Sequence, residues 1–247
     1  MVADIALMDS KKKVTISWSG GKDSAFALYK IMVSGEYEVV HLHTVINAET
    51  KRVGLHGVGE KLIEAQAKGL GLKLVKLYLP PTEDHDAYTK LMENFYHQCA
   101  SAKIDAVVFG DIFLEDLKIF RERMLTTYGL EGIFPIWGID SARLVEDFLN
   151  VGFKTLLCSA DKKYFKADSL GKTIDQEFLR SLSAKVDPAG ENGEFHTFVY
   201  DGPVFNNPIH LKQGEVVEKN YSYKMTMENG EVTTVESIFL FKDLTID

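Results

Sequence analysis

Short apolar segments alternate with helical patterns along the first half of the chain. Apolar runs rich in β-branched residues predict buried strands at residues 14–18, 38–46, 72–79 and 105–109. The clearest helix is expected at residues 84–102, where one face carries Tyr88, Leu91, Met92, Phe95 and Cys99. Strands that alternate with helices form β-α-β units, so the pattern predicts an α/β fold built on a Rossmann-like open parallel sheet. We expect about five strands in the order 3-2-1-4-5.

The pattern changes after residue 132 and predicts a smaller mixed α/β lobe. Its expected elements are helices at 141–150 and 173–184, a strand at 154–159, and β segments at 222–227 and 232–241. The two β segments flank Glu228-Asn229-Gly230, and Asn-Gly favours a tight hairpin turn. The sequence therefore predicts an ATP-binding domain at residues 1–132 and a substrate-binding lobe at residues 133–247 that ends in a β-hairpin.

The composition is that of a globular protein and narrows the class of partner. The 247 residues are 45% hydrophobic and 26% charged, and no apolar run approaches the roughly 20 residues that span a bilayer. No signal peptide is recognisable, so we expect a cytoplasmic protein without a membrane partner. The net charge of -8 makes nucleic acid an unlikely partner. The two cysteines form no paired spacing, which argues against structural zinc.

The segment with the clearest chemistry is Ser19-Gly-Gly-Lys-Asp-Ser24, which lies between a predicted strand and a predicted helix. Gly20 and Gly21 allow the backbone N–H groups to approach an anion closely, and the N-terminus of the following helix adds a positive dipole. Lys22 can neutralise a phosphate, and Ser19 and Ser24 can donate hydrogen bonds. Asp23 can cap the helix or hold a magnesium ion through water. The segment therefore predicts a phosphate site.

Two more polar segments fall where a site is expected. Gly110 and Asp111 follow the fourth predicted strand, beside the crevice of the sheet, where Gly110 allows close nucleotide approach and Asp111 could orient ribose or magnesium. An ordinary turn explains them equally well. Glu194 and His196 alternate, so on a strand they would share a face and could act as a general base. A polar loop is the alternative.

These motifs resemble a known series. The glycine loop resembles the SGG-x-DS pyrophosphate loop of the PP-loop ATP pyrophosphatases, and it differs from G-x-x-x-x-G-K-[ST] because Gly20 and Gly21 are adjacent. With Gly110-Asp-Ile112, Phe134-Pro-Ile-Trp137 and Gly190-Glu-Asn-Gly-Glu-Phe-His-Thr197, it is similar to the diphthine–ammonia ligase family over about residues 14–205. The segment after Asp111 is similar to the bacterial branch of that family.

The resemblance implies a ligase that uses ATP and magnesium. A carboxylate-bearing acceptor, on a protein in the family's archaeal and eukaryotic members, would attack the α phosphorus, pyrophosphate would leave, and ammonia would displace AMP. Residues 19–24 and Gly110 would bind ATP, with Asp23 as the magnesium ligand. We expect catalytic roles for Lys22, Asp111, Glu194 and His196, and substrate contacts from Glu191, Thr197 and Trp137. A homodimer and the identity of the acceptor stay open.

Two other functions remain possible at this point. Cys158 could carry sulfur to tRNA, although a buried small side chain is the commoner role of a lone cysteine. A non-catalytic nucleotide sensor would need only the glycine loop. His41, His43 and His56 are expected to have structural or adenine-side roles. Arg121 and Arg123 could contact substrate, but charges on a helix more often form a solvated face, which is the expectation for both.

Overall fold

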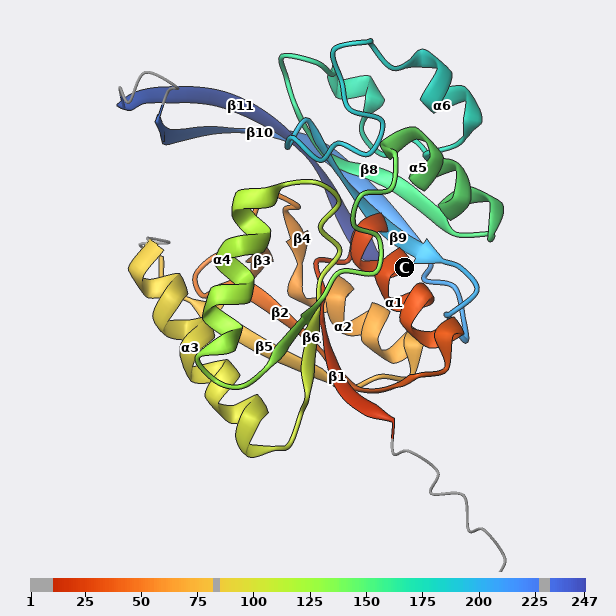
Figure 1. Cartoon of the computed structure of the whole chain (residues 1–247). Helices are drawn as coiled ribbons and strands as arrows, with labels where there is room; N and C mark the ends of the chain where they lie inside the picture. The colour runs from red at the N-terminus through yellow and green to blue at the C-terminus, as the bar shows by residue number, and fades with distance from the viewer. Residues whose placement is uncertain (1–10, 82–84, 227–231) are drawn as a thin grey trace, which may run out of the picture.

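A five-stranded parallel sheet forms the centre of the first half of the chain (Figure 1) in a computed structural model that describes residues 11–81, 85–226 and 232–247. Its strands are β1 (Lys12–Ser17), β2 (Tyr37–Asn47), β5 (Leu74–Leu79), β6 (Ala106–Val108) and β7 (Glu131–Ile133). They lie in the order β5-β2-β1-β6-β7, and every neighbouring pair is parallel. This is the predicted order 3-2-1-4-5, so the Rossmann-like fold class is confirmed.

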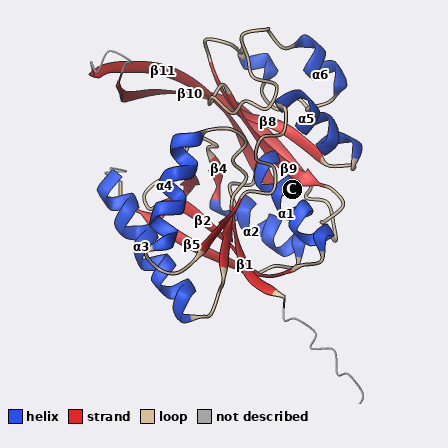
Figure 2. Ribbon diagram, in the orientation of Figure 1, coloured by secondary structure: helices blue, strands red, loops and turns tan. Residues whose placement is uncertain are grey.

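Helices cover both faces of this sheet, as Figures 1 and 2 show. Helices α3 (His85–Ser101) and α4 (Glu115–Thr126) lie on one face, and α1 (Lys22–Ser34) and α2 (Glu60–Leu70) on the other. The predicted apolar face of α3 is confirmed, since its Met92, Phe95 and Cys99 are buried in one cluster with Val107 and Phe109 of the β6 segment. A small hairpin of β3 (Arg52–Val53) and β4 (Val58–Gly59) connects β2 to α2.

The second half of the chain contributes an antiparallel sheet in the order β10-β11-β8-β9. Its strands are β8 (Lys154–Asp161), β9 (Phe195–Asp201), β10 (Leu211–Thr226) and β11 (Val232–Ile246). Buried residues of this sheet, of α1 and α2, and of the parallel sheet belong to one hydrophobic cluster. Helices α1 and α2 therefore form a layer between the two sheets (Figure 2).

Residues from both sides of the boundary predicted near residue 132 pack together in this shared core. Helix α5 (Ser141–Asn150) brings the Phe148 ring within 6.1 Å of Phe26 on α1, and the Phe153 ring lies 6.5 Å from Phe26. The division into residues 1–132 and 133–247 remains a prediction, because a shared core neither requires nor forbids two domains.

Two predicted elements differ in length from the observed ones. The helix expected at 173–184 is only α6 (Gln176–Ser181), because Thr173 forms a β-bridge with Leu156 and the Asp175 carboxylate caps the helix at the Phe178 N–H, 2.8 Å away. A 3₁₀ turn (Ala167–Ser169) precedes it. The terminal hairpin is longer than predicted, since β10 pairs with β11 from Leu211 to Thr226. Its Glu228-Asn229-Gly230 turn lies outside the described residues.

The strand order places one crevice at the middle of the parallel sheet. Strands β1 and β6 are neighbours, but the chain leaves β1 toward β2 on one side and leaves β6 toward β7 on the other. Ligands bind at such a point in open α/β sheets. The glycine loop follows β1 and the Gly110 segment follows β6, so both meet at this crevice.

Candidate active site

The glycine loop is fixed by backbone geometry. Gly20 has φ +84°, and a Cβ there would lie 2.7 Å from Oε1 of Gln66. The Gly20 carbonyl accepts hydrogen bonds from Gln66 Nε2 and from the Val199 N–H, both at 2.9 Å. Only glycine fits this position, because both the φ angle and the contact exclude a side chain.

Gln66 is a fully buried residue of α2 that ties the loop to the second sheet. Its Oε1 accepts a hydrogen bond from Trp18 Nε1 at 2.9 Å, and its Nε2 also donates to the Val199 carbonyl at 2.7 Å. One amide therefore links the end of β1, the glycine loop and β9. Buried amides this fully bonded hold their surroundings in a single arrangement.

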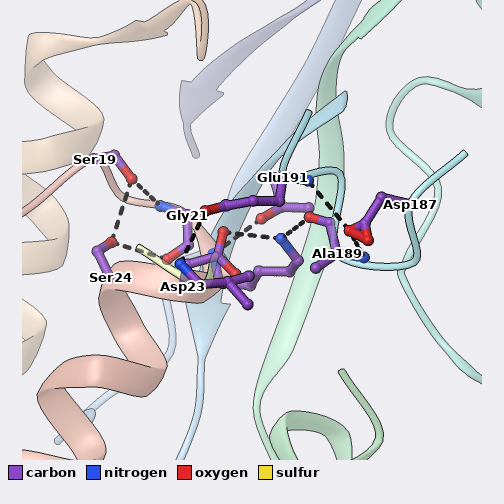
Figure 3. Close-up of polar contacts among 10 residues, drawn as sticks. Ser19, Gly21, Asp23, Ser24, Asp187, Ala189 and Glu191 are labelled. Carbon is purple, nitrogen blue, oxygen red and sulfur yellow. Dashed lines mark hydrogen bonds and ion pairs between the residues drawn. The ribbon is translucent and has the colours of Figure 1, made fainter. Parts of the chain in front are cut away.

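Figure 3 shows the glycine loop where it leads into α1. Two backbone N–H groups at this junction already donate hydrogen bonds within the protein. The Gly21 N–H donates to Ser19 Oγ at 3.3 Å, and the Lys22 N–H donates to Thr197 Oγ1 at 3.0 Å. Gly21 is the N-cap and no side chain caps the helix, so Asp23 does not have the capping role that the sequence suggested. Thr197 on β9 binds the loop itself.

The Lys22 side chain points into the protein between the loop and residues 187–191. It is 2% exposed, and its Nζ donates to Asp23 Oδ2 at 2.9 Å and to the Ala189 carbonyl. Burial raises the pKa of Asp23, while the Lys22 ammonium opposes that rise. Asp23 Oδ1 has no hydrogen-bond partner among the described residues, so it is open to a cation or a donor.

Gly110 and Asp111 form the opposite side of the crevice. A Cβ on Gly110 would lie 2.7 to 2.9 Å from backbone atoms of Asp23 and Ser24, so the two segments touch main chain to main chain. Asp111 is bound by the Arg121 guanidinium, with N···O distances of 2.6 and 3.1 Å. The same guanidinium lies 4.3 Å from the centre of the Phe109 ring.

The expectation that Arg121 lies on a solvated helix face is therefore wrong. An ion pair with Asp111 and packing on Phe109 draw this side chain to the crevice, and it is only 17% exposed. Arg123, two residues further along α4, is exposed as expected.

Glu191 carries a carboxyl group whose protonation is tuned by its surroundings. Its Oε1 accepts a hydrogen bond from the Ile112 N–H at 2.9 Å. Burial raises the pKa of Glu191 to about 7, helped by the neighbouring carboxylates Asp23 and Asp111 and opposed by the Ile112 N–H and Lys22. A carboxyl group that titrates near neutrality can both accept and release a proton there.

The rings of His196 on β9 and His56 in the β3–β4 turn are in contact, with centroids 4.4 Å apart and planes tilted by 37°. Burial lowers the pKa of His56 to about 4, and Lys22 lowers it further, against a hydrogen bond to the Thr197 backbone. Burial, His56 and Lys22 together lower the pKa of His196 well below its usual value. Both rings are therefore neutral hydrogen-bonding groups at physiological pH.

These segments enclose a cavity of about 320 Å³, within the range of small-ligand pockets. Its walls bring together predicted and unpredicted residues. The predicted ones are Ser19, Lys22, Asp23, Ser24, Gly110, Asp111, Glu191, His196 and Thr197. The sequence left a role at the site open for two further lining residues, His56 and Arg121, and it did not predict the others, which are Ser17, Phe109, Leu117, Gly190 and Phe195.

Four residues predicted for the site do not line this cavity. Gly20 and Gly21 lie behind the cavity wall, where they leave no room for side chains. Glu194 lines a neighbouring groove, described below. Trp137 is not among the cavity residues, and its ring lies 4.4 Å from Lys118 Nζ.

The other histidines and the cysteine are held inside the protein. Thr15 Oγ1 bonds to Nδ1 of His41 at 2.7 Å and of His43 at 2.9 Å, which fits the structural role expected for both. Cys158 is 1% exposed, and burial raises the pKa of its thiol to about 12. A thiol of this kind is a poor nucleophile.

The residues around the cavity fit a nucleotide and its magnesium ion. Ser19, Lys22 and Ser24 line the cavity beside Gly110, so two hydroxyl groups and one amino group are available to a phosphate at the start of α1. Asp23 offers an unpartnered carboxylate oxygen for magnesium. No group of three acidic, histidine or cysteine side chains in the described ranges could hold a metal alone, so phosphates and water would supply the other ligands.

A glycine loop at the switch point of an open parallel sheet defines a nucleotide-binding α/β protein of the PP-loop class. Residues 12–132 match the model of the diphthamide synthase N-terminal domain, and residues 140–230 match that of the diphthamide synthase C-terminal domain. The chain belongs to the diphthamide synthase family, which confirms the resemblance found in the sequence. It is an enzyme of the ATP-dependent amide ligase class.

Curated relatives agree with this family. A diphthine–ammonia ligase of Danio rerio is 24% identical over 81% of this chain and 86% of its own length, and that of Homo sapiens is 26% identical over 81% and 82%. Among solved structures, a predicted subunit of a tRNA methyltransferase from Methanocaldococcus jannaschii has 17% identity and a TM-score of 0.38, covering 68% of this chain and 85% of that chain. A similarity this low supports no inference. No helix in the described part of the chain is both long and apolar enough to cross a bilayer.

Proposed function

We propose that the chain adenylates an acceptor carboxylate with ATP, releases pyrophosphate, and transfers the acyl group to ammonia. The observation that carries this proposal is the meeting of three separate segments in one cavity: the glycine loop, Gly110-Asp111 and residues 190–197. They supply an anion site, a buried ammonium group and a carboxyl group that titrates near pH 7. An acyl-adenylate reaction needs all three.

In the first step an acceptor carboxylate oxygen attacks the α phosphorus, and the bond from that phosphorus to the pyrophosphate oxygen breaks. The β and γ phosphates would bind at residues 19–24, and Asp23, whose Oδ1 has no partner among the described residues, would hold a magnesium ion that would supply positive charge to them. Lys22 leaves the Ala189 carbonyl and turns to the phosphates, where its charge stabilises the transition state. Asp111 holds the Arg121 guanidinium at the same cavity.

In the second step the nitrogen of ammonia attacks the acyl carbon, and the bond from that carbon to the AMP oxygen breaks. The attacking nitrogen loses one proton, which Glu191 accepts. A pKa of about 7 suits this group to the transfer, because it is largely deprotonated at cellular pH and can return the proton to water.

We place the ATP site on residues 1–132 and the acceptor on residues 133–247. The acceptor is a diphthine-like carboxylate, and Glu191 and Thr197 lie where ATP and acceptor would meet. Magnesium, ammonia and the acceptor complete the reactants. Burial of Cys158 disfavours sulfur transfer to tRNA, the second function that the sequence left open.

The proposal is tested by following ATP labelled in the α phosphate. The protein is incubated with ammonium and a panel of carboxylate acceptors that includes elongation factor 2 carrying diphthine, and AMP and pyrophosphate are expected. Lys22→Ala should slow product formation roughly 100-fold, whereas Lys30→Ala, on the same helix but away from the cavity, should not. Release of ADP and phosphate instead would refute adenylation, and tight ATP binding with no turnover would favour a nucleotide sensor.

A further inference from the structure

A second and larger hollow lies beside the candidate active site. It has a volume of about 1080 Å³ and runs between the end of β8, the segment before β9, and the hairpin of β10 and β11. Its charged lining residues are balanced, with three acidic side chains, Asp161, Glu194 and Glu236, and three basic ones, Lys162, Lys163 and Lys185. We call this hollow the Glu194 groove.

Glu194 differs from the other carboxylates of the groove because it is buried. It is 5% exposed, and its Oε1 accepts hydrogen bonds from the Asp187 N–H at 2.9 Å and from Asn192 Nδ2 at 3.3 Å. Its Oε2 has no hydrogen-bond partner within the described ranges. A buried carboxylate oxygen without a donor is costly, so its position is best explained by a ligand that donates hydrogen bonds.

Two further acceptors continue from Glu194 toward the ATP cavity. Glu194 and His196 are two positions apart at the start of β9, and the His196 ring contacts the His56 ring, which lines the ATP cavity. His196 Nε2 and His56 Nδ1 also lack partners in the part of the chain that the structure describes. A neutral imidazole carries one donor and one acceptor nitrogen, so either ring can offer an acceptor to a ligand.

We infer that Glu194 binds ammonium at the floor of the groove, that the ion releases one proton to water there, and that His196 and His56 line the path by which the resulting ammonia reaches the ATP cavity. A small cation rich in donors would satisfy the unpartnered oxygen of Glu194, and ammonium has four N–H donors and no acceptor. Neutral imidazoles suit the path, because they accept hydrogen bonds from ammonia without repelling ammonium as a charged ring would. The inference rests on the proposed function in one respect only, the use of ammonia as the nucleophile.

The route also separates the two substrates. The acceptor and ATP occupy the cavity around Lys22, whereas the nitrogen source enters from the Glu194 groove, whose lining residues differ from those of the cavity. The nucleophile therefore does not have to pass the bound ATP to reach the acyl group.

Thallium(I), an ion close to ammonium in size and charge, tests the site without any catalytic turnover. Crystals of the full chain soaked in thallium should show an anomalous peak at Glu194 that ammonium displaces. The peak should be lost in Glu194→Gln, which keeps an oxygen for the Asp187 N–H, and kept in Glu236→Gln, which removes an exposed carboxylate from the same groove. No peak in the wild type, or a peak unchanged in Glu194→Gln, would overturn the inference.

Kinetics give a second and independent readout. Glu194→Gln should raise the KM for ammonium about 10-fold or more, because a charge-assisted contact is lost, while the KM for ATP stays unchanged. Hydroxylamine, which is uncharged at neutral pH, should react with the variant as fast as with the wild type. An unchanged KM for ammonium would refute the ammonium site but not the proposed function. Failure of the wild type to release AMP and pyrophosphate would count against the proposed function, whereas the thallium experiment would still test the ammonium site.

Discussion

Two of the segments that line the cavity are held by different means. The glycine loop is fixed by its main chain: Gly20 has no room for a side chain, and its carbonyl is bound twice. Residues 187–197 are fixed by side chains, with carboxylates of Glu191 and Glu194 accepting from backbone N–H groups. The glycine geometry and main-chain hydrogen bonds of Gly20 do not depend on pH, whereas the second segment contains Glu191, whose pKa burial raises to about 7. The difference shows a rigid loop beside an adjustable segment whose charge changes with pH.

The largest loss of stability is expected from a substitution that inserts a Cβ where two backbone segments touch. Gly110→Ala places a Cβ within 2.7 to 2.9 Å of backbone atoms that cannot turn aside, so the free energy of unfolding should fall by roughly 3 kcal/mol and ATP binding should weaken sharply. Urea denaturation and calorimetric titration with ATP measure both. Gly54→Ala is the matched control, because its Cβ would meet nothing within 4 Å and should cost less than about 0.5 kcal/mol.

A smaller effect is expected where a side chain supports the rigid loop. Gln66→Leu leaves Trp18 Nε1 and the Val199 carbonyl without their partner, which should lower the free energy of unfolding by about 2 kcal/mol. Gln213→Leu removes a comparable amide bond to the Gly171 carbonyl at an exposed site and should have little effect. Equal losses in the two variants would contradict the special role of Gln66.

Thr197 joins the two segments, and its substitution should destabilise the protein less than that of Gln66. Thr197→Val keeps the shape but leaves the Lys22 N–H without its acceptor, for an expected loss of about 1.5 kcal/mol in denaturant unfolding. Thr197→Ser retains the hydroxyl and should lose clearly less. If Ser and Val behaved alike, the hydrogen bond would not be what joins the segments.

The smallest effect concerns the adjustable segment and depends on pH. Because the pKa of Glu191 is raised to about 7, folding favours its protonated form, and wild-type stability falls as pH rises from about 4.5 to about 7. Glu191→Gln removes this loss, so the variant should be more stable above pH 7 by less than about 1 kcal/mol, and equal to the wild type below pH 4.5. Thermal unfolding across this range measures the difference, and a constant offset at all pH values would contradict the assigned pKa.

The sequence predicted the parallel sheet and most of the cavity for local reasons. Short apolar strands and a glycine turn before a helix are patterns within ten or so residues, and strand order then brings Lys22 and Asp111 to the same crevice. The catalytic and binding roles of these residues stay predictions until they are tested by substitution.

Other residues of the site could not be found in this way. Gln66 acts on Gly20 and Val199, and His56 reaches His196, across separations that no local pattern encodes. Arg121 has the sequence surroundings of a surface helix, and only its contact with Asp111 shows otherwise. The prediction for Trp137 rested on a motif alone, and the structure places its ring against Lys118.

The layer of α1 and α2 between the two sheets limits how the protein can be divided. A fragment that ended near residue 132 would keep the entire glycine loop, yet it would expose the apolar underside of both helices and deprive Gly20 of Val199 and Lys22 of Thr197. The part of the chain that carries the glycine loop therefore does not carry all the contacts that hold it. In gene fusions and truncations, a piece that retains those contacts must continue into β9.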